Sequence, residues 1–387
     1  MNSTPTTPPR PFDVTAVFPQ LAPLARTATR LHPRPGSPSP QDSSIGGPLL
    51  WPANEPWPHC DGPHVVDGMN EALSPADVRL ERQIRAASRG RGLTPQERET
   101  LDRIRPPRQL PLRVAVAPYE GSIAMLPVAQ LYVRDVPDLH TPEGADLLQV
   151  LWCPFDHPIM PKTALFWRSA ATVTDILTTP PEPPAMQFDG YLPEPCLLNP
   201  EQVTEYPDHL ELSKELQEQL ENWSVWQAAD TDVDSSYASY PQEFYDNELA
   251  GAPGWKVGGW PRWGATDPTP RLCPACGSDM DALLTIATFE GDDNSSWLPN
   301  EVCADREHTS PPSSHTGPEG QAVIDFFRAQ GIEVHDRGRV PRDVRVAPLG
   351  TKPVPRQPTA VQIGSGYDQQ LYVCPAAPEH PHSELMH

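Results

Sequence analysis

Two segments of the chain recur, and this recurrence is the feature that most constrains the fold. "IGGPLLWP" at residues 45–52 is similar to "VGGWPRWG" at 257–264, and prolines and then a cysteine follow each one. "LLQVLWCPFDHP" at 147–158 is similar to "QLYVCPAAPEHP" at 370–381, since both have an apolar run, a Cys-Pro pair and a final His-Pro. Because related units can pack around one core, the sequence predicts two similar halves.

The local patterns predict mostly strands. Residues 125–135 alternate between apolar and polar side chains, and short β-prone runs begin at 147, 282 and 370. Helices are few: Ser74-Pro75 and Thr94-Pro95 begin two of them, Leu212, Leu216 and Leu220 mark one face of another, and residues 319–331 form a fourth. The predicted fold class is α+β, mainly antiparallel sheet with an internal duplication and a few peripheral helices.

The composition divides the chain. Proline accounts for 53 of the 387 residues, well above the usual share, which indicates a core separated by long connections. Residues 1–43 are rich in Pro, Ser and Thr and are predicted to be a disordered tail. The first half then covers 44–230 with a helical insertion, and the second half covers 231–387 with a long loop insertion.

The same segments resemble a known family. Ile45-Gly46-Gly47, "WPANEPWP", the strand at 127–131 and "LLQVLWCP" are similar to the YwqG-like family of bacterial proteins of unknown function, as are "KVGGWPRW", "ALLTIAT" and "GSGYDQQLYVCP". The resemblance covers most of residues 45–376, apart from the insertions at 66–120 and 300–355. It implies an antiparallel α+β fold and no established activity.

The charge limits the classes of partner. The formal net charge is −22, which disfavours binding to nucleic acid phosphates and favours a basic protein partner. No apolar run reaches the length that spans a bilayer, and the N-terminus lacks the apolar core of a signal peptide. The sequence therefore predicts a cytoplasmic protein with reduced cysteines.

The turn "CPACG" is the sharpest chemical signal. Two residues between Cys273 and Cys276 let both sulfurs face one ion, and Gly277 permits the turn. We predict a structural zinc site with Cys303 and His308 as the other ligands. Further Cys–His pairs are alternative completions: Cys60 with His64, Cys153 with His157, and Cys374 with His380. Two other interpretations are a plain hairpin turn with reduced thiols and a redox-active pair, although the following residues resemble a strand, not the helix start that lowers a thiol pKa.

Tryptophans beside prolines allow two interpretations. Trp51, Trp57, Trp260 and Trp263 could line a binding surface for a peptide or sugar, or they could cap the ends of a sheet with a thin aliphatic core.

The sequence contains no recognisable catalytic set, so it predicts no catalytic residue. The predicted function is a non-catalytic binding or interaction protein, with zinc as a structural cofactor. The alternative is a metal-dependent hydrolase centred on Cys273 and Cys276, which would need an open coordination position and a general base.

Overall fold

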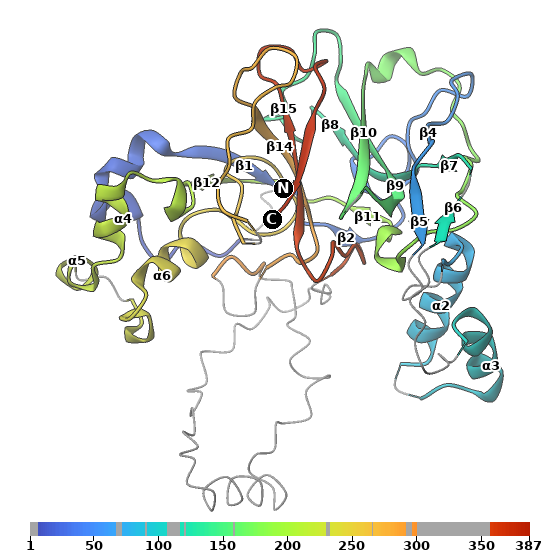
Figure 1. Ribbon diagram of the computed structural model, residues 1–387, viewed down its shortest axis with the longest axis horizontal. Helices are drawn as coiled ribbons and strands as arrows, with labels where there is room; N and C mark the ends of the chain where they lie inside the picture. Colours follow the sequence, from blue (N-terminus) through green and yellow to red (C-terminus); the bar gives the residue numbers. More distant parts are fainter. Residues whose placement is uncertain are drawn as a thin grey trace, which may run out of the picture.

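The computed structural model describes residues 7–66, 72–89, 91–106, 117–119, 121–157, 159–229, 233–264, 266–291, 296–299 and 357–387. Two antiparallel six-stranded sheets form its centre, and short helices lie at the two opposite ends (Figure 1). The predicted fold class, α+β with mainly antiparallel sheet, is confirmed. The predicted helix at 319–331 lies outside the described residues.

The first sheet has the order β12-β1-β13-β14-β15-β16. Its strands are β12 (Glu201–Glu205), β1 (Arg26–Arg30), β13 (Lys256–Gly258), β14 (Asp281–Ala287), β15 (Asp368–Val373) and β16 (Ser383–Met386). The second sheet has the order β2-β11-β3-β8-β9-β10. Its strands are β2 (Arg34–Pro35), β11 (Cys196–Leu197), β3 (Ser44–Ile45), β8 (Leu126–Tyr132), β9 (Leu147–Asp156) and β10 (Pro161–Arg168).

The two sheets are built to the same plan. In each sheet, the segment that the sequence identifies as repeated supplies the third strand: Ile45 pairs with Ala129, and Val257 pairs with Leu284. The register then shifts at the same place in both sheets, next to Ala129 between β8 and β9 and next to Leu284 between β14 and β15. The surroundings of Ile45 and Val257 are thus equivalent, as the internal repeat predicts.

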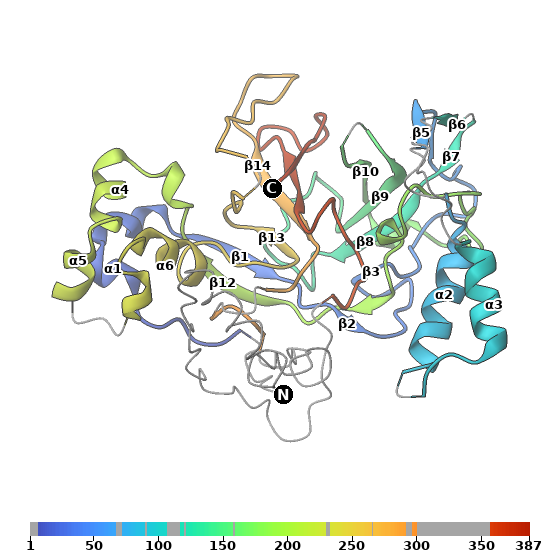
Figure 2. The same ribbon diagram turned by 60° about the horizontal axis from the view of Figure 1, so that its bottom comes forward.

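The halves also exchange one strand each. β1 precedes the first Gly-Gly segment in the chain but pairs with β13 of the other sheet, whereas β11 pairs with β3. β2 and β12 stay with the other strands of their own halves, where β2 forms one edge of the second sheet and β12 one edge of the first (Figure 2). By this strand order the two halves meet between β10 and β11, earlier than the boundary at 230 and 231 that the sequence indicates.

The described part of the predicted tail is ordered, which corrects the prediction that residues 1–43 are disordered. Residues 14–35 contain α1 (Val14–Val17), the 3₁₀ helix η1 (Pro19–Leu24), β1 and β2. β1 lies between β12 and β13, and Arg30 is fully buried. Thr and Arg give "RTATR" a polar composition, but strand pairing and buried acceptors for Arg30 outweigh it.

Two helical groups flank the sheets. α2 (Pro75–Ala87) and α3 (Pro95–Ile104) lie beside the second sheet, and both begin at the predicted caps, Ser74 and the Thr94–Glu97 capping box. At the other end lie α1, α4 (Lys214–Leu220), α5 (Trp223–Ala228) and α6 (Pro241–Glu248) (Figure 1). The predicted helix over 208–223 is shorter than expected, because a 3₁₀ turn and the cap Ser213 precede α4.

Smaller elements complete the described chain. They are β4 (His59–Cys60), β5 (His64–Val66), β6 (Ala117–Tyr119), β7 (Ile123–Ala124), η2 (Ala170–Thr172), η3 (Asp189–Tyr191), η4 (His209–Glu211) and η5 (Ser235–Tyr237). β4 pairs with β7, and β5 pairs with β6.

One apolar core joins the sheets. Ile45 and Val150 of the second sheet and Val257 and Leu371 of the first belong to the same buried cluster. The glycines of the repeated segments are required by their backbone: Gly259 has a φ of +72°, and a Cβ there would lie 2.2 Å from a carboxylate oxygen of Glu205. Burying apolar surface from both halves at once makes each half depend on the other.

Candidate metal centres

The C-x-x-C segment is a tight hairpin turn that precedes β14. The Gly277 N–H donates to the Cys273 carbonyl at 2.8 Å, and an isolated bridge joins Leu272 to Asp279. Gly277 has a φ of +75°, a conformation that glycine adopts without strain. The predicted turn is confirmed. A strand follows it, so the hairpin lacks the helix N-terminus that activates redox pairs.

Cys374 and His380 complete a cluster of four ligand atoms with this turn. The Cys273 Sγ lies 3.5 Å from His380 Nδ1, and the Cys276 Sγ lies 3.5 Å from the Cys374 Sγ. All four ligand atoms lie within 4.8 Å of one another, so the cluster can hold a metal ion. We call it the second cluster.

The sequence selects a different pair for this turn. Cys303 and His308 lie outside the described residues, and the four-ligand set is complete without them. Cys374 and His380 appear in the sequence only as one pair among several alternatives. Their position directly after β15, which is paired to β14 next to the turn, is what brings them to Cys273.

The thiols of the second cluster differ in their environment. Hydrogen bonds with Ser278 lower the pKa of Cys276 to about 6, and this residue is exposed. Burial, followed by the contact with Cys276, raises the pKa of Cys374. Since the thiolate is the form that binds metals, Cys276 is the accessible and readily ionised sulfur of the second cluster.

A first cluster lies in the other half. Cys60 of β4, His64 of β5, Cys153 of β9 and His157 at the end of β9 also place one ligand atom each within 4.8 Å of the others. The Cys153 Sγ is 3.3 Å from His64 Nε2, and the Cys60 Sγ is 3.6 Å from His157 Nε2. This set can hold a metal ion as well.

The first cluster is the more deeply buried of the two. Cys153 is fully buried, His64 is 2% exposed and Cys60 is 8% exposed. Burial lowers the pKa of His64 and of His157, which keeps both imidazoles in the neutral form that a metal requires. Burial and the neighbouring Cys60 raise the pKa of Cys153.

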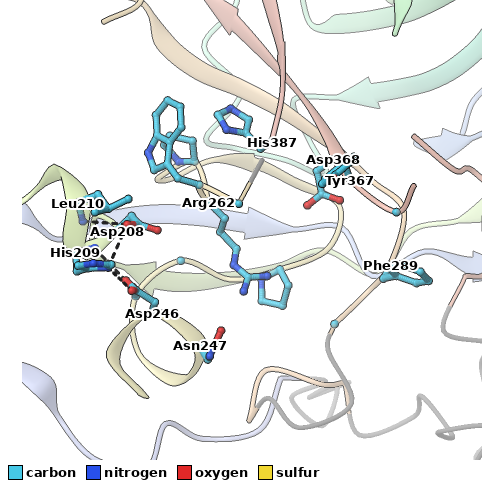
Figure 3. A pocket seen from close by; sticks show the side chains of 18 residues that line it. Asp208, His209, Leu210, Asp246, Asn247, Arg262, Phe289, Tyr367, Asp368 and His387 are labelled. Atoms are coloured by element: carbon cyan, nitrogen blue, oxygen red, sulfur yellow. Dashed lines mark hydrogen bonds and ion pairs between the residues drawn. The ribbon is translucent and has the colours of Figure 1, made fainter. Parts of the chain in front are cut away.

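A third group of possible ligands lies in a pocket of about 360 Å³ (Figure 3). Asp246 accepts hydrogen bonds from the backbone N–H of His209 and from its ring, and this contact raises the pKa of His209. Asp208 accepts from the Leu210 N–H. Because these hydrogen bonds already hold the group together, we read it as a structural turn at the rim of the pocket. Arg262 and Asp368 lie on the other walls.

The four predicted surface tryptophans divide into two kinds. Trp51 and Trp57 are 1% and 7% exposed, and their indole N–H groups donate to the carbonyls of Glu55 and Met125. These two cap the core and offer little surface for a partner. Trp260 and Trp263 are half-buried: Arg26 stacks on Trp260, and Trp263 lines the pocket.

The sequence matches no protein-family model, and no curated protein is significantly similar to it. The resemblance to the YwqG-like family therefore stays a prediction. Within the described residues, the helices are all too short or too polar to cross a membrane.

Proposed function

We propose that this chain is a non-catalytic binding protein of the YwqG-like type. In this proposal a structural zinc holds the second cluster together, and the pocket of Figure 3 receives a basic side chain of a protein partner. The supporting observations are the closed ligand set, the lining of the pocket and the acidic surface.

Zinc is the ion that this donor set favours. Three sulfurs and one imidazole nitrogen form a common ligand combination for structural zinc, and ideal tetrahedral coordination separates two such ligand atoms by roughly 3.6–3.8 Å. The measured separations of 3.5 Å are close to this value. A hydrolase needs a coordination position open to water. Four protein ligands fill a tetrahedral zinc, so we favour the structural role over the metal-dependent hydrolase.

The lining of the pocket is the observation that carries the binding proposal. Asp208, Asp246 and Asp368 supply three carboxylates, against the single arginine Arg262 and two histidines, and His209 is already paired with Asp246. Burial lowers the pKa of the other histidine, His387, to about 4, so this imidazole is neutral at physiological pH. Trp263 adds an indole beside the carboxylates, a combination suited to a lysine or arginine side chain.

An oligolysine peptide tests this proposal as a defined basic probe. Calorimetric titration should show binding that weakens as salt rises. Asp246→Asn should weaken binding about two- to fivefold, since a charge pair that solvent still screens contributes roughly 0.5–1 kcal/mol, and the Asp246 side chain is 20% exposed. Asp102→Asn on α3, at the opposite end of the molecule, removes the same charge and is the control (Figure 1). Equal affinities for the two variants, or affinity that ignores salt, would reject the pocket as the binding site.

A further inference from the structure

The first cluster has the geometry of a separate metal site. Two pairs of its ligand atoms lie 3.3 Å and 3.6 Å apart, Cys153 Sγ with His64 Nε2 and Cys60 Sγ with His157 Nε2. A sulfur and a nitrogen bound to one tetrahedral zinc lie about 3.6 Å apart. The two thiols and two imidazoles thus already approach the positions that coordination requires.

The position of the first cluster in the fold repeats that of the second. Gln149 of β9 pairs with Gln130, and Gln370 of β15 pairs with Thr285 at the equivalent point of the other sheet. Counted from these glutamines, Cys153 and Cys374 occupy the same position of their strands. Cys60 and Cys273 each follow a Gly-Gly segment. Both clusters therefore join the segment after the Gly-Gly pair to the end of the Cys-Pro strand of the same half.

Burial argues against the other roles of a Cys–His pair. A nucleophilic cysteine needs an accessible thiolate, whereas Cys153 is fully buried beside a His64 that is 2% exposed. Three buried ligands and the half-buried His157, without a shared ion, would gain only weak S–H hydrogen bonds in return for their desolvation. An ion bound by all four would compensate this loss, and it would fix the short strands β4 and β5 onto β9.

We propose that the first cluster, Cys60, His64, Cys153 and His157, is a zinc site of its own, separate from the second cluster. It is closed and structural, with two sulfur and two nitrogen ligands. The protein would then hold two zinc ions, one in each half. The first cluster can hold its ion whether or not the second cluster holds one, since the ligands of the first cluster come entirely from the first half.

Metal stoichiometry of the full chain tests the proposal. Native mass spectrometry of the zinc-loaded protein should find two ions in the wild type and one in His157→Asn. His59→Asn is the matched control, because His59 is adjacent to Cys60 but its Nδ1 lies against the Trp57 carbonyl, outside the cluster. This control should keep both ions. Cys276→Ser, in the second cluster, should lose that cluster's ion and keep the one in the first cluster. The two variants therefore report on the two sites separately.

Cobalt substitution of the wild type gives a first readout that needs no variant. The thiolate-to-cobalt absorption of the wild type should correspond to five thiolates per chain, three from the second cluster and two from the first. It should fall to three thiolates in His157→Asn if that variant keeps only the second ion. One ion in the wild type, retained in His157→Asn and lost in Cys276→Ser, would overturn the proposal.

Discussion

The two clusters occupy equivalent places in the two halves, yet they differ in ligands and in exposure. The first uses two cysteines and two histidines and is mostly buried. The second uses three cysteines and one histidine, and Cys276 is exposed. Equivalent strands therefore set where the possible ligands meet, while local segments set which residues they are and how exposed they are.

The sheets show the same combination of shared plan and different chemistry. Lys256 of β13 is 1% exposed and forms an ion pair with the fully buried Glu205 at 2.8 Å. The equivalent residue of β3 is Ser44, which is also buried but uncharged. At the β10 edge of the second sheet, Arg168 stacks on Trp51 and pairs with Glu55. The equivalent residue of the first sheet, His387, packs on Trp263, and both line the pocket.

The largest effect is expected from removing the metal. Structural zinc contributes on the order of 10 kcal/mol in zinc-finger peptides, so chelation should lower the melting temperature of the protein strongly. A chromogenic chelator should release two ions in two phases, the second cluster first because Cys276 is exposed. Calorimetry and the release kinetics measure both effects. A single phase, or an unchanged melting temperature, would contradict the difference between the clusters.

A smaller difference in stability is expected between variants of β13 and β3, the third strands of the first and second sheets. Lys256→Met leaves the buried Glu205 carboxylate without its ion pair, which we expect to lower the free energy of unfolding by about 3–5 kcal/mol. The matched change in the other sheet is Ser44→Ala, since no group among the described residues forms a hydrogen bond with this hydroxyl. We expect this change to cost less than about 1 kcal/mol. Urea unfolding of both variants makes the comparison, and equal losses would count against it.

A smaller difference in unfolding energy is expected between the edge of the second sheet at Arg168 and the edge of the first sheet at His387. Arg168 donates to both Glu55 oxygens at 2.6 and 2.7 Å and to Gln149 at 2.8 Å. Arg168→Ala should therefore cost about 1.5–3 kcal/mol, the usual range for hydrogen bonds to charged groups. His387→Ala loses the hydrogen bond with the Tyr372 hydroxyl at 2.9 Å and the ring contact with Trp263, and it should cost about 1–1.5 kcal/mol, less than the Arg168 change. The reverse order of the two unfolding energies would show that the pocket edge is the tighter one.

A further effect is a change in pH dependence beside the first sheet. Burial raises the pKa of Glu290 to about 7. Its contribution to stability is complete below about pH 4.5 and is lost as the pH rises through about 7. Buried His32 has the opposite pH dependence. Desolvation lowers the His32 pKa to about 4, so the stability that His32 contributes is present above about pH 6.5 and is lost as the pH falls.

Glu290→Gln should therefore be more stable relative to the wild type at pH 8 than at pH 5. Unfolding curves at the two pH values measure this difference. Parallel behaviour of variant and wild type would show that Glu290 does not titrate in this range.

Much of the fold could be predicted from local patterns, and the remainder depended on distant pairing. Alternation and capping predicted β8, α2 and α3, and the repeated Gly-Gly and Cys-Pro segments predicted the common plan of the sheets. β1 was missed because its polar residues resemble a disordered tail. Its place in the sheet depends on exchange between halves, and the burial of Arg30 depends on distant acceptors, the Trp297 and Glu290 carbonyls and the Thr7 hydroxyl.

The site was predictable in the same partial way. Spacing identified the turn at Cys273 and Cys276, since two intervening residues suffice to bring two sulfurs together. The remaining ligands lie about a hundred residues further on, where spacing gives no information. The signal that could have identified Cys374 and His380 was the repeat itself, because Cys153 and His157 recur there in the same order.

Anomalous diffraction from crystals of the zinc-loaded chain, recorded at the zinc absorption edge, would locate the ions directly. Two peaks are expected, one among Cys60, His64, Cys153 and His157 and one among Cys273, Cys276, Cys374 and His380, with zinc–sulfur distances near 2.3 Å. No peak at either cluster, or a single peak at Asp208, His209 and Asp246, would contradict the view that each half carries its own metal centre.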